Sequence, residues 1–401
     1  MTLHPLRGQP AERRGAGADR THGKTQTALY KLIRPLLFSL DPERAHDIML
    51  GALRQAYRVP GTTALIRRAY ARRTPRVPVR AMGLQLRNPL GLAAGLDKNA
   101  NCIGPLSDFG FGFLELGTVT PHAQPGNPKK RMFRLAAHEA IINRMGFNSI
   151  GLDAFIANLA RVQRTCPLGI NIGKNRDTPA ERAPDDYLLG LRAVYPFADY
   201  ITVNISSPNT PGLRALQERD SLAVLLAALK SEQEILARMH ARYVPLAIKI
   251  APDLSDAEID AIARLLLEHR IDAVVATNTT VSRPQLEDAP LSREGGGLSG
   301  RPLRPLATHV IRELHRGVAG RIPIIGVGGI SDADDAWEKI LAGADLLQIY
   351  TALVYRGPIV VRNIVSGIRS RLVALGVETF AQARAAHAHH PAAGARGAAT
   401  D

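Results

Sequence analysis

The stretch YITVNISSPNTPG, from Tyr200 to Gly212, contains the pattern from which we predict the fold class. It begins with a short apolar run and changes at Asn204 to a turn of asparagine, serine, proline and glycine. A short and nearly continuous apolar run is typical of a parallel strand that is covered on both faces. The polar turn marks the end of that strand. The same pattern recurs along the chain between residues 91 and 349, so this stretch is one unit of a repeated architecture.

Eight such runs follow one another along the chain. They are Gly91–Ala94, Phe113–Gly117, Gly169–Ile172, Tyr200–Val203, Leu246–Ile250, Ala273–Ala276, Pro323–Val327 and Leu346–Ile349. Intervening stretches such as Leu222–His240, Asp256–His269 and Asp332–Ala342 have the length and apolar period of helices. Eight parallel strands with helical crossovers predict an α/β fold of the (β/α)8 TIM-barrel type. An open doubly wound sheet is the alternative, and either fold binds its ligand where the strands end.

The composition limits the classes of partner. The formal net charge is +15, but no nucleic-acid-binding motif accompanies it and aromatic residues make up only 5% of the chain, so we expect no nucleic-acid partner. The two cysteines, Cys102 and Cys166, form no CxxC pair, which disfavours a disulfide framework or a thiolate metal site. No apolar run approaches the length of a membrane span. We therefore expect an intracellular protein.

The two ends of the chain differ from its centre. Residues 1–26 are rich in Gly, Arg, Thr and Pro without an apolar period, and we predict a disordered N-terminal extension. From about Ala381 the chain consists mainly of Ala, His and Gly, and we predict a disordered C-terminal tail over residues 376–401 whose histidines bind no metal. Between them we predict an N-terminal helical segment over residues 27–75 and the barrel over residues 76–375.

The segment Thr27–Arg58 predicts two short amphipathic helices. An apolar stripe recurs at three- and four-residue steps in the first helix: Leu29, Leu32, Ile33, Leu36, Leu37 and Leu40. Asp41-Pro42-Glu43 has the cap acceptor, proline and acidic residue of a helix start. Such a hairpin either caps the barrel or forms a docking surface for a membrane or a lipid-like substrate. The residues alone leave both interpretations open.

Amides, hydroxyls and lysines dominate the positions that follow the predicted strands. No histidine or carboxylate cluster with metal-ligand spacing occurs there, so we expect no metal. Amides that both donate and accept suit a planar, imide-like ring, whereas lysines such as Lys98 and Lys249 suit a carboxylate. The Gly326–Gly329 turn is either a tight bend or a phosphate site of the kind that barrels carry. This pattern predicts a phosphate-bearing cofactor beside a small polar ring.

Ser207 is the candidate for proton transfer at these strand ends. A serine before proline is often only a turn residue. No histidine lies in its loop, which disfavours a Ser-His nucleophile. A serine placed over a substrate C–H bond could still accept a proton.

Ten long motifs follow one another along the chain in the same order as in the class 2, quinone-dependent dihydroorotate dehydrogenases. The chain resembles this family from about Leu37 to Val373. The motifs are LDPERAH (Leu40–His46), NPLGLAAGLDKN (Asn88–Asn99), GTVTPHAQPGNPKKRMFRL (Gly117–Leu135), INRMGFN (Ile142–Asn148), GINIGKN (Gly169–Asn175), NISSPNTPGLR (Asn204–Arg214), IKIAPDL (Ile248–Leu254), ATNTT (Ala276–Thr280), GGLSGRPL (Gly296–Leu303) and GVGGI (Gly326–Ile330). The number and order of these motifs exclude coincidence.

The resemblance implies an FMN-bearing barrel that oxidises (S)-dihydroorotate to orotate in pyrimidine synthesis. Ser207 would take the proton from C5 while a hydride passes from C6 to the flavin. The implied FMN site comprises Ala94, Gly95, Leu96, Asp97, Lys98, Thr118, Asn171, Asn204, Lys249, Thr277, Gly300, Gly329, Tyr350 and Thr351. The implied substrate site comprises Lys98, Asn143, Arg144, Met145, Gly146, Phe147, Asn204, Asn209, Asn278 and Thr279.

The resemblance also implies the electron acceptor. Class 1 members use cysteine as the base, whereas this loop has serine, and the Thr27–Arg58 hairpin matches the class 2 extension that forms a quinone tunnel at the membrane. We expect His46, Arg134 and Tyr350 along the quinone route. The implied location is peripheral, on the cytoplasmic side of the cell membrane. The alternatives are a soluble class 1-like enzyme that uses fumarate or NAD, and an idle flavin-binding barrel.

Overall fold

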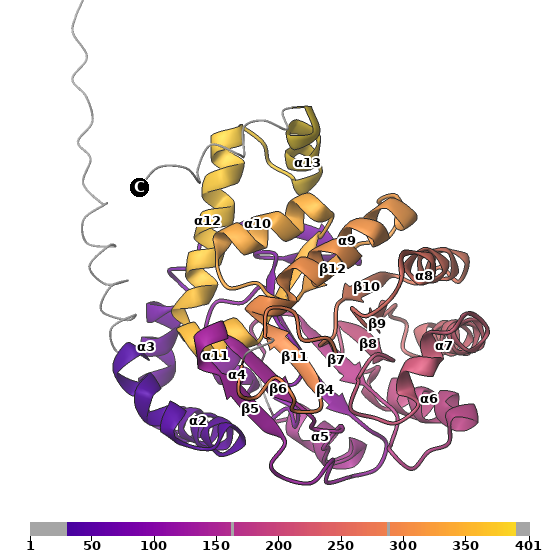
Figure 1. The fold of residues 1–401 in the computed structure, drawn as a ribbon, viewed down its shortest axis with the longest axis horizontal. Coiled ribbons are helices and arrows are strands. Elements are labelled where there is room, and N and C mark those ends of the chain that lie inside the picture. Colours follow the sequence, from indigo (N-terminus) through magenta and orange to yellow (C-terminus); the bar gives the residue numbers. More distant parts are fainter. Residues whose placement is uncertain (1–29, 162–163, 287–288, 390–401) are drawn as a thin grey trace, which may run out of the picture.

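The computed structural model describes residues 30–161, 164–286 and 289–389. The predicted extension over residues 1–26 lies outside the described residues. A closed barrel of parallel strands forms the centre, and helices surround it (Figure 1). This architecture confirms the predicted (β/α)8 barrel, and the open doubly wound sheet was wrong.

The barrel contains all eight predicted strands. In chain order they are β3 (Leu90–Leu92), β4 (Phe113–Val119), β7 (Leu168–Ile172), β8 (Tyr200–Asn204), β9 (Leu246–Ile250), β10 (Ala273–Ala276), β12 (Ile324–Val327) and β13 (Leu346–Ile349). Each strand pairs in parallel with its neighbour, and β13 pairs with β3 to close the ring. The carboxyl ends of all eight strands therefore meet at one face of the barrel.

Helices follow the strands and cover the outside of the barrel. They are α4 (Ile103–Ser107), α5 (Leu152–Leu159), α6 (Ala183–Val194), α7 (Arg219–Met239), α8 (Asp256–Glu268), α9 (Arg304–Val318), α10 (Ala333–Ala342), α11 (Thr351–Arg356) and α12 (Ile359–Leu375). The start of α8 is a capping box in which Ser255 and Glu258 each bond the other's backbone N–H. The Asp332 side chain caps α10 in the same way that a serine would.

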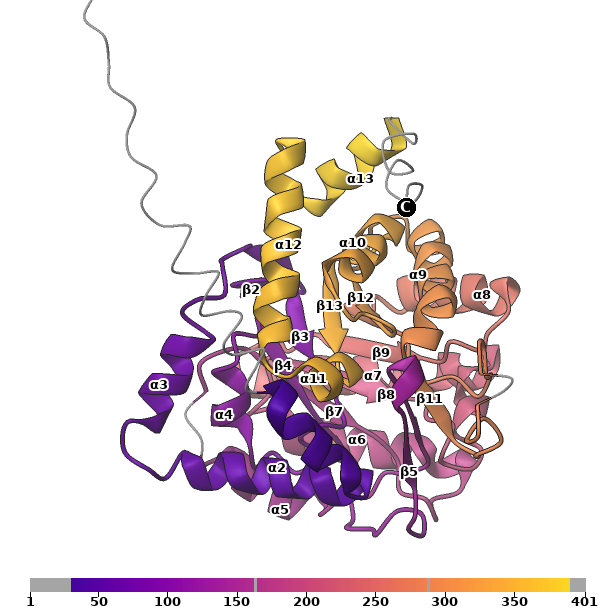
Figure 2. The same ribbon diagram turned by 60° about the vertical axis from the view of Figure 1, so that its left-hand side comes forward.

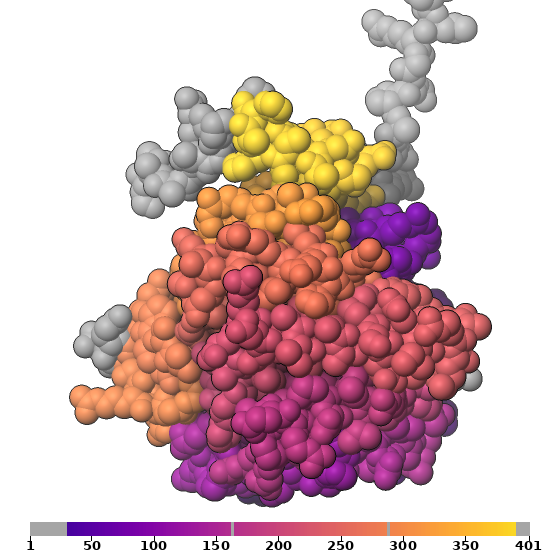
Figure 3. Space-filling model, turned by 90° about the vertical axis from the view of Figure 1, so that its right-hand side faces the viewer, coloured from indigo at the N-terminus to yellow at the C-terminus, as the bar shows by residue number. Residues whose placement is uncertain are grey.

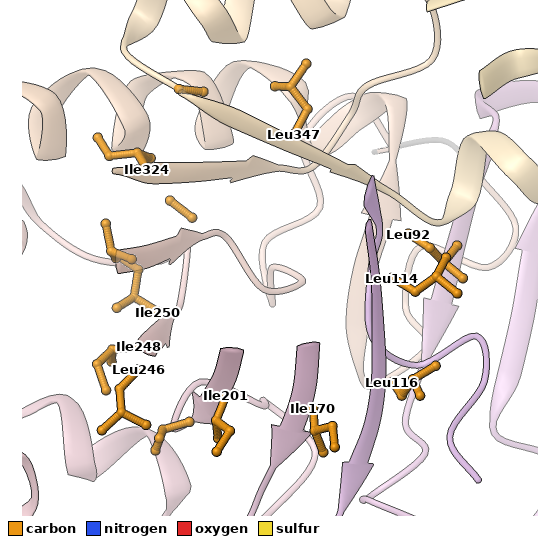
Figure 4. Close-up of a cluster of buried hydrophobic side chains, with 14 of the residues drawn as sticks. Leu92, Leu114, Leu116, Ile170, Ile201, Leu246, Ile248, Ile250, Ile324 and Leu347 are labelled. Carbon is orange, nitrogen blue, oxygen red and sulfur yellow. The ribbon is translucent and has the colours of Figure 1, made fainter. Parts of the chain in front are cut away.

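Side chains alternate along each strand between the helix layer and the barrel interior. Leu114, Ile201 and Leu246 belong to the large apolar cluster that includes the surrounding helices (Figure 4). The residues next to them, such as Phe113 and Tyr200, belong to a second cluster in the barrel interior. The hairpin of β1 (Val79–Ala81) and β2 (Leu84–Leu86) adds Ala81 and Leu86 to that inner cluster and closes the barrel at its amino-terminal end.

Two additions cover the opposite, carboxyl-terminal end. One is an antiparallel sheet in the order β11 (Gly297–Gly300), β6 (Ala140–Asn143), β5 (Met132–Leu135). The other is α2 (Pro42–Ala56), which a helix over residues 30–39 precedes in the N-terminal helical segment. The last helix of that segment, α3 (Thr62–Ala69), pairs instead through Arg67 with Asp108, just before β4. α2 packs against β5, as Figure 2 shows. None of the described helices is both long and apolar enough to cross a bilayer.

The prediction of a disordered tail from residue 376 was wrong for residues 380–389. These residues form α13 (Phe380–His389), which packs against α10 and α12. Phe380 and Ala383 are buried, and Arg384 donates to the carbonyl oxygens of Ile340 and Ala344 and pairs with Asp345. In Figure 3 the yellow C-terminal helices stand at one end of the molecule, on the orange segment beneath them. Residues 390–401 lie outside the described residues.

The close packing of the barrel interior gives a stability prediction. A Cβ added to Gly169 on β7 would lie 2.1 Å from Cζ of the buried Tyr200, so Gly169→Ala forces the ring or the strand to move. We expect a loss of about 1–3 kcal/mol in the free energy of unfolding, measured as a lower urea midpoint. The control is Gly51→Ala in α2, where an added Cβ would have no described atom within 4 Å apart from its own helix backbone, so stability should stay equal or rise. Equal midpoints for the two variants would contradict this packing.

Candidate active site

A cavity of about 380 Å³ lies at the carboxyl-terminal end of the barrel. Its walls come from the ends of the strands, from the antiparallel sheet and from α2. Pockets that bind small ligands in proteins have this size and combine apolar walls with a few convergent polar groups. One cavity therefore connects the strand ends to the N-terminal helical segment.

Neutral amides form a hydrogen-bonded network on the barrel side of the cavity, which we call the amide network. Asn204, at the end of β8, donates from Nδ2 to Thr118 Oγ1 at 3.1 Å and to Asn171 Oδ1 at 3.2 Å. Its Oδ1 accepts from Asn278 Nδ2 at 3.2 Å. The backbone N–H of Thr279 in turn donates to Asn278 Oδ1 at 2.8 Å. Because these partners fix each amide, the amide network presents its donors and acceptors to the cavity in set directions.

Ser207 lies in the loop that follows β8, which we call the Ser207 loop (residues 205–212). Its side chain lines the cavity and is only 6% exposed, and its Oγ accepts from the backbone N–H of Asn209 at 3.3 Å. Asn209 Nδ2 donates to the backbone oxygen of Asn143 at 3.0 Å, which ties the loop to β6. The hydroxyl is thus held at the cavity wall. Among the described residues that line the cavity, His46 on α2 is the only histidine.

Two lysines bring positive charge to the cavity. Burial lowers the pKa of Lys98 to about 7, and the Arg131 charge acts in the same direction, while Glu43 and Asp47 oppose both. Lys98 Nζ donates to Asn148 Oδ1 at 2.5 Å. Burial also lowers the pKa of Lys249, against the opposing effect of Glu115. An anionic ligand would restore the charged form of either lysine.

A buried carboxylate lies directly beneath this site. Glu115 on β4 is fully buried, and its Oε1 accepts from Asn171 Nδ2 at 2.8 Å. Its Oε2 accepts from Tyr200, Thr202 and Gln348 at 2.9, 3.1 and 2.7 Å. Four donors from three strands, β7, β8 and β13, therefore satisfy one charge in the centre of the barrel.

Gly300, Gly328 and Gly329 lie together on one side of the cavity, and we call this group the glycine cradle. Gly328 and Gly329 follow β12 with φ of +112° and +72°, and Gly300 ends β11 with φ of +95°. A Cβ on Gly329 would lie 2.4 Å from Cα of Arg304. Ser299 and Thr351 share a hydrogen bond of 2.9 Å beside these glycines and also line the cavity. Exposed backbone N–H groups and hydroxyls without an opposing carboxylate suit a phosphate.

The far side of the cavity is formed by α2. Glu43, His46, Asp47, Leu50 and Arg54 line it there. Burial, and then the Lys98 charge, lower the pKa of His46. Tyr350 also lines the cavity, and burial raises the pKa of its hydroxyl to about 12. His46 and Tyr350 are therefore uncharged near neutral pH.

The structure brings most of the predicted site residues together around this cavity. Those that line it are His46, Ala94, Gly95, Leu96, Asp97, Lys98, Thr118, Asn143, Met145, Gly146, Phe147, Asn204, Ser207, Asn209, Lys249, Thr277, Asn278, Thr279, Gly300, Gly329, Tyr350 and Thr351.

Three predicted residues do not line the cavity. Asn171 lies behind the cavity wall and supports the amide network by accepting from Thr118 and donating to Glu115. The Arg144 side chain points instead to Glu294, at 2.6 Å, and stacks over Phe133. Arg134 donates to backbone oxygens of residues 37 and 40, next to the N-terminal helical segment.

Sequence reasoning missed several polar residues of the site. Glu115 and Gln348 each interrupt an otherwise apolar strand, and this interruption was a signal available in the sequence. Asn148 and Ser299 gave no such signal, because their partners Lys98 and Thr351 are distant in the chain. The buried Oε1 of Gln348 has no hydrogen-bond partner among the described residues and lies at the cavity, where a ligand donor could reach it.

The fold and the site define a flavin-dependent oxidoreductase of the (β/α)8 class. A family model described as dihydroorotate dehydrogenase matches residues 76–372. The chain is 54% identical over 344 residues to the dihydroorotate dehydrogenase (quinone) of Marinobacter nauticus, covering 86% of this chain and 100% of that protein. It is 53% identical to the protein of the same name from Methylobacillus flagellatus, covering 84% and 98%. The chain belongs to the dihydroorotate dehydrogenase family.

Solved structures agree with this assignment. The crystal structure of DHODH from Eimeria tenella in complex with ferulenol matches with a TM-score of 0.78 at 41% identity, covering 86% of this chain and 94% of that one. The ligand-free structure of the Eimeria tenella protein matches with a TM-score of 0.77. The similarity therefore includes the N-terminal part of the chain as well as the barrel.

The glycine cradle gives a prediction for cofactor binding. Gly329→Ala places a methyl group against the Arg304 backbone, so the backbone of the cradle must move, and we expect the purified variant to lose most of its flavin. The measurement is the ratio of flavin absorbance to protein. Gly320→Ala is the matched control, because its φ of +73° imposes the same strain while no described atom lies within 4 Å. Equal flavin loss in both variants would show that strain, and not the cradle, causes it.

Proposed function

We propose that this protein oxidises (S)-dihydroorotate to orotate in pyrimidine synthesis and passes the electrons through FMN to a membrane quinone. The observation that carries the proposal is the position of Ser207, which is buried at the wall of a cavity. The amide network and two lysines line the same cavity. The names of the relatives, dihydroorotate dehydrogenase (quinone), support the same reaction.

FMN fits the barrel side of the cavity. When bound, the flavin accepts a hydride and makes its two electrons available to a second substrate. The glycine cradle, with Ser299 and Thr351, would hold the phosphate. The other residues that would hold FMN are Ala94, Gly95, Leu96, Asp97, Lys98, Thr118, Asn171, Asn204, Lys249, Thr277 and Tyr350. Lys249 would supply positive charge where the ring gains electron density.

The remaining polar groups suit dihydroorotate. Its ring has imide donors and acceptors that complement Asn143, Asn204, Asn209 and Asn278, with Thr279 beside them. The loop at residues 144–147 would contact the dihydroorotate ring through its backbone. The Arg144 side chain would not take part, because it forms an ion pair with Glu294. Lys98 would bind the carboxylate of the substrate, and this anion would raise the pKa of the lysine back toward its usual range.

Ser207 would act as the base. Its Oγ would accept the proton from C5 as the hydride leaves C6, so that the substrate loses two hydrogens and gains a C5–C6 double bond. The serine must then release its own hydroxyl proton. Asn209 would orient the serine through its backbone N–H.

The N-terminal helical segment would provide the quinone site and the contact with the membrane. Large apolar side chains are exposed along it: Leu32, Ile33, Leu36, Ile48, Val59 and Leu65. Such a surface, with basic residues among the apolar ones, is typical of helices that lie in a membrane interface. Quinone would enter the cavity past His46 and Tyr350, with Arg134 outside the cavity at the start of this route. The protein would bind peripherally, on the cytoplasmic side of the cell membrane.

Bleaching of the bound flavin by dihydroorotate, without any acceptor, tests this function. We expect Ser207→Ala to retain flavin and to slow bleaching by roughly 10²–10⁴-fold, because general-base catalysis is lost. Ser292→Ala is the control, since that serine does not line the cavity, and should bleach as the wild type does. Near-normal bleaching by Ser207→Ala would contradict the base assignment, and an unbleached wild type would contradict the proposed function.

A further inference from the structure

The geometry points to a positioning role for the ion pair between Glu43 and Arg131: we infer that it couples the N-terminal helical segment to the Ser207 loop and so sets the affinity for dihydroorotate. This inference rests on the proposed function. Neither residue was predicted to bind FMN, substrate or quinone, although Glu43 lines the cavity on its α2 side. Glu43 is at the start of α2, and Arg131 ends the loop of residues 124–131, which we call the 124–131 loop.

The pair is buried and bidentate. Arg131 Nη2 lies 2.7 Å from Glu43 Oε1, and Arg131 Nε donates to Glu43 Oε2 at 3.1 Å. The two side chains are only 7% and 12% exposed. The guanidinium holds the pKa of the Glu43 carboxyl below its usual value. A bidentate pair in this environment fixes orientation as well as distance, unlike a solvent-exposed pair.

Arg131 also organises its own loop. Its Nη1 donates to the backbone oxygens of Pro125 and Asn127, both at 2.7 Å. The 124–131 loop therefore folds around the guanidinium, whose other edge is held by α2. The position of α2 and the shape of the loop are linked through one side chain.

Asn127 carries this link to the site. Its Nδ2 donates to the backbone oxygen of Asn209 in the Ser207 loop at 3.2 Å and to that of Arg144 at 3.0 Å. Asn209 is the residue whose backbone N–H meets Ser207 and whose side chain bonds Asn143. A continuous series of hydrogen bonds thus runs from α2 through Arg131 and Asn127 to the loop that carries the proposed base.

The pair also acts on Lys98 through its charges. Arg131 lowers the pKa of Lys98, and Glu43 raises it. The other charged group that faces Lys98 is Asp47 on α2, which also raises this pKa, and the nearby His46 has a lowered pKa. Removing one member of the pair should therefore move the Lys98 titration in a direction that depends on which member is lost.

The test compares Glu43→Gln and Arg131→Met in the flavin-bleaching reaction with dihydroorotate, without quinone. We expect both variants to retain flavin and to need roughly tenfold more dihydroorotate for half-maximal bleaching, because the Ser207 loop loses its support. The pH dependence of the bleaching efficiency should shift in opposite directions. The Lys98 titration should appear in the pH profile as a change of efficiency near pH 7. Glu43→Gln should move this change to lower pH, and Arg131→Met should move it to higher pH.

Glu232→Gln is a matched control. Glu232 forms an equally bidentate pair with Arg192, at 2.8 and 2.7 Å, on α7 and α6 away from the cavity, so its loss should leave bleaching unchanged. If Glu43→Gln bleaches as this control does and alters only the quinone concentration required, the pair merely docks α2 and the inference is wrong. Shifts in the same pH direction for both variants would also overturn it. A wild-type protein that dihydroorotate does not bleach would instead refute the proposed function.

Discussion

The buried carboxylate of Glu115 is the constraint on which the site depends. A single negative charge in the barrel interior is costly unless its lone pairs are satisfied, and here donors from β7, β8 and β13 satisfy them. The Asn171 amide that donates to Glu115 must then present its oxygen to Thr118 and Asn204. The charge therefore sets the direction of the first amides above it, and these amides determine which groups a ligand ring can meet.

Two parts of the chain build the cavity, and they give it two different walls. The strand ends contribute fixed amides, lysines and the glycine cradle, whereas α2 contributes a mixed wall with His46, Leu50 and Arg54. A polar substrate and a lipid-soluble acceptor need different surroundings, and one cavity with two such walls can accommodate them in turn. The exposed apolar residues of the N-terminal helical segment lie on the part of the chain that forms the second wall.

The sequence predicted the repeated parts of the molecule well, because period and turn chemistry are local signals. All eight strands and the shared cavity followed from them. α13 could not be predicted, since only Phe380 and Ala383 are buried and an Ala-rich segment shows no apolar period. The Arg144 and Arg134 side chains also differ from expectation, because their partners Glu294 and the backbone near residue 40 are distant in the chain. Contacts of this kind depend on tertiary packing.

Dihydroorotate oxidation by the purified protein with different acceptors is the sharpest test of the proposed function. A short-chain quinone, fumarate and NAD would be compared at equal enzyme and substrate concentrations. We expect turnover with the quinone and none with fumarate or NAD. Turnover with fumarate or NAD would contradict the role given to the N-terminal helical segment. No turnover with any acceptor, despite bound flavin, would contradict the proposed function itself.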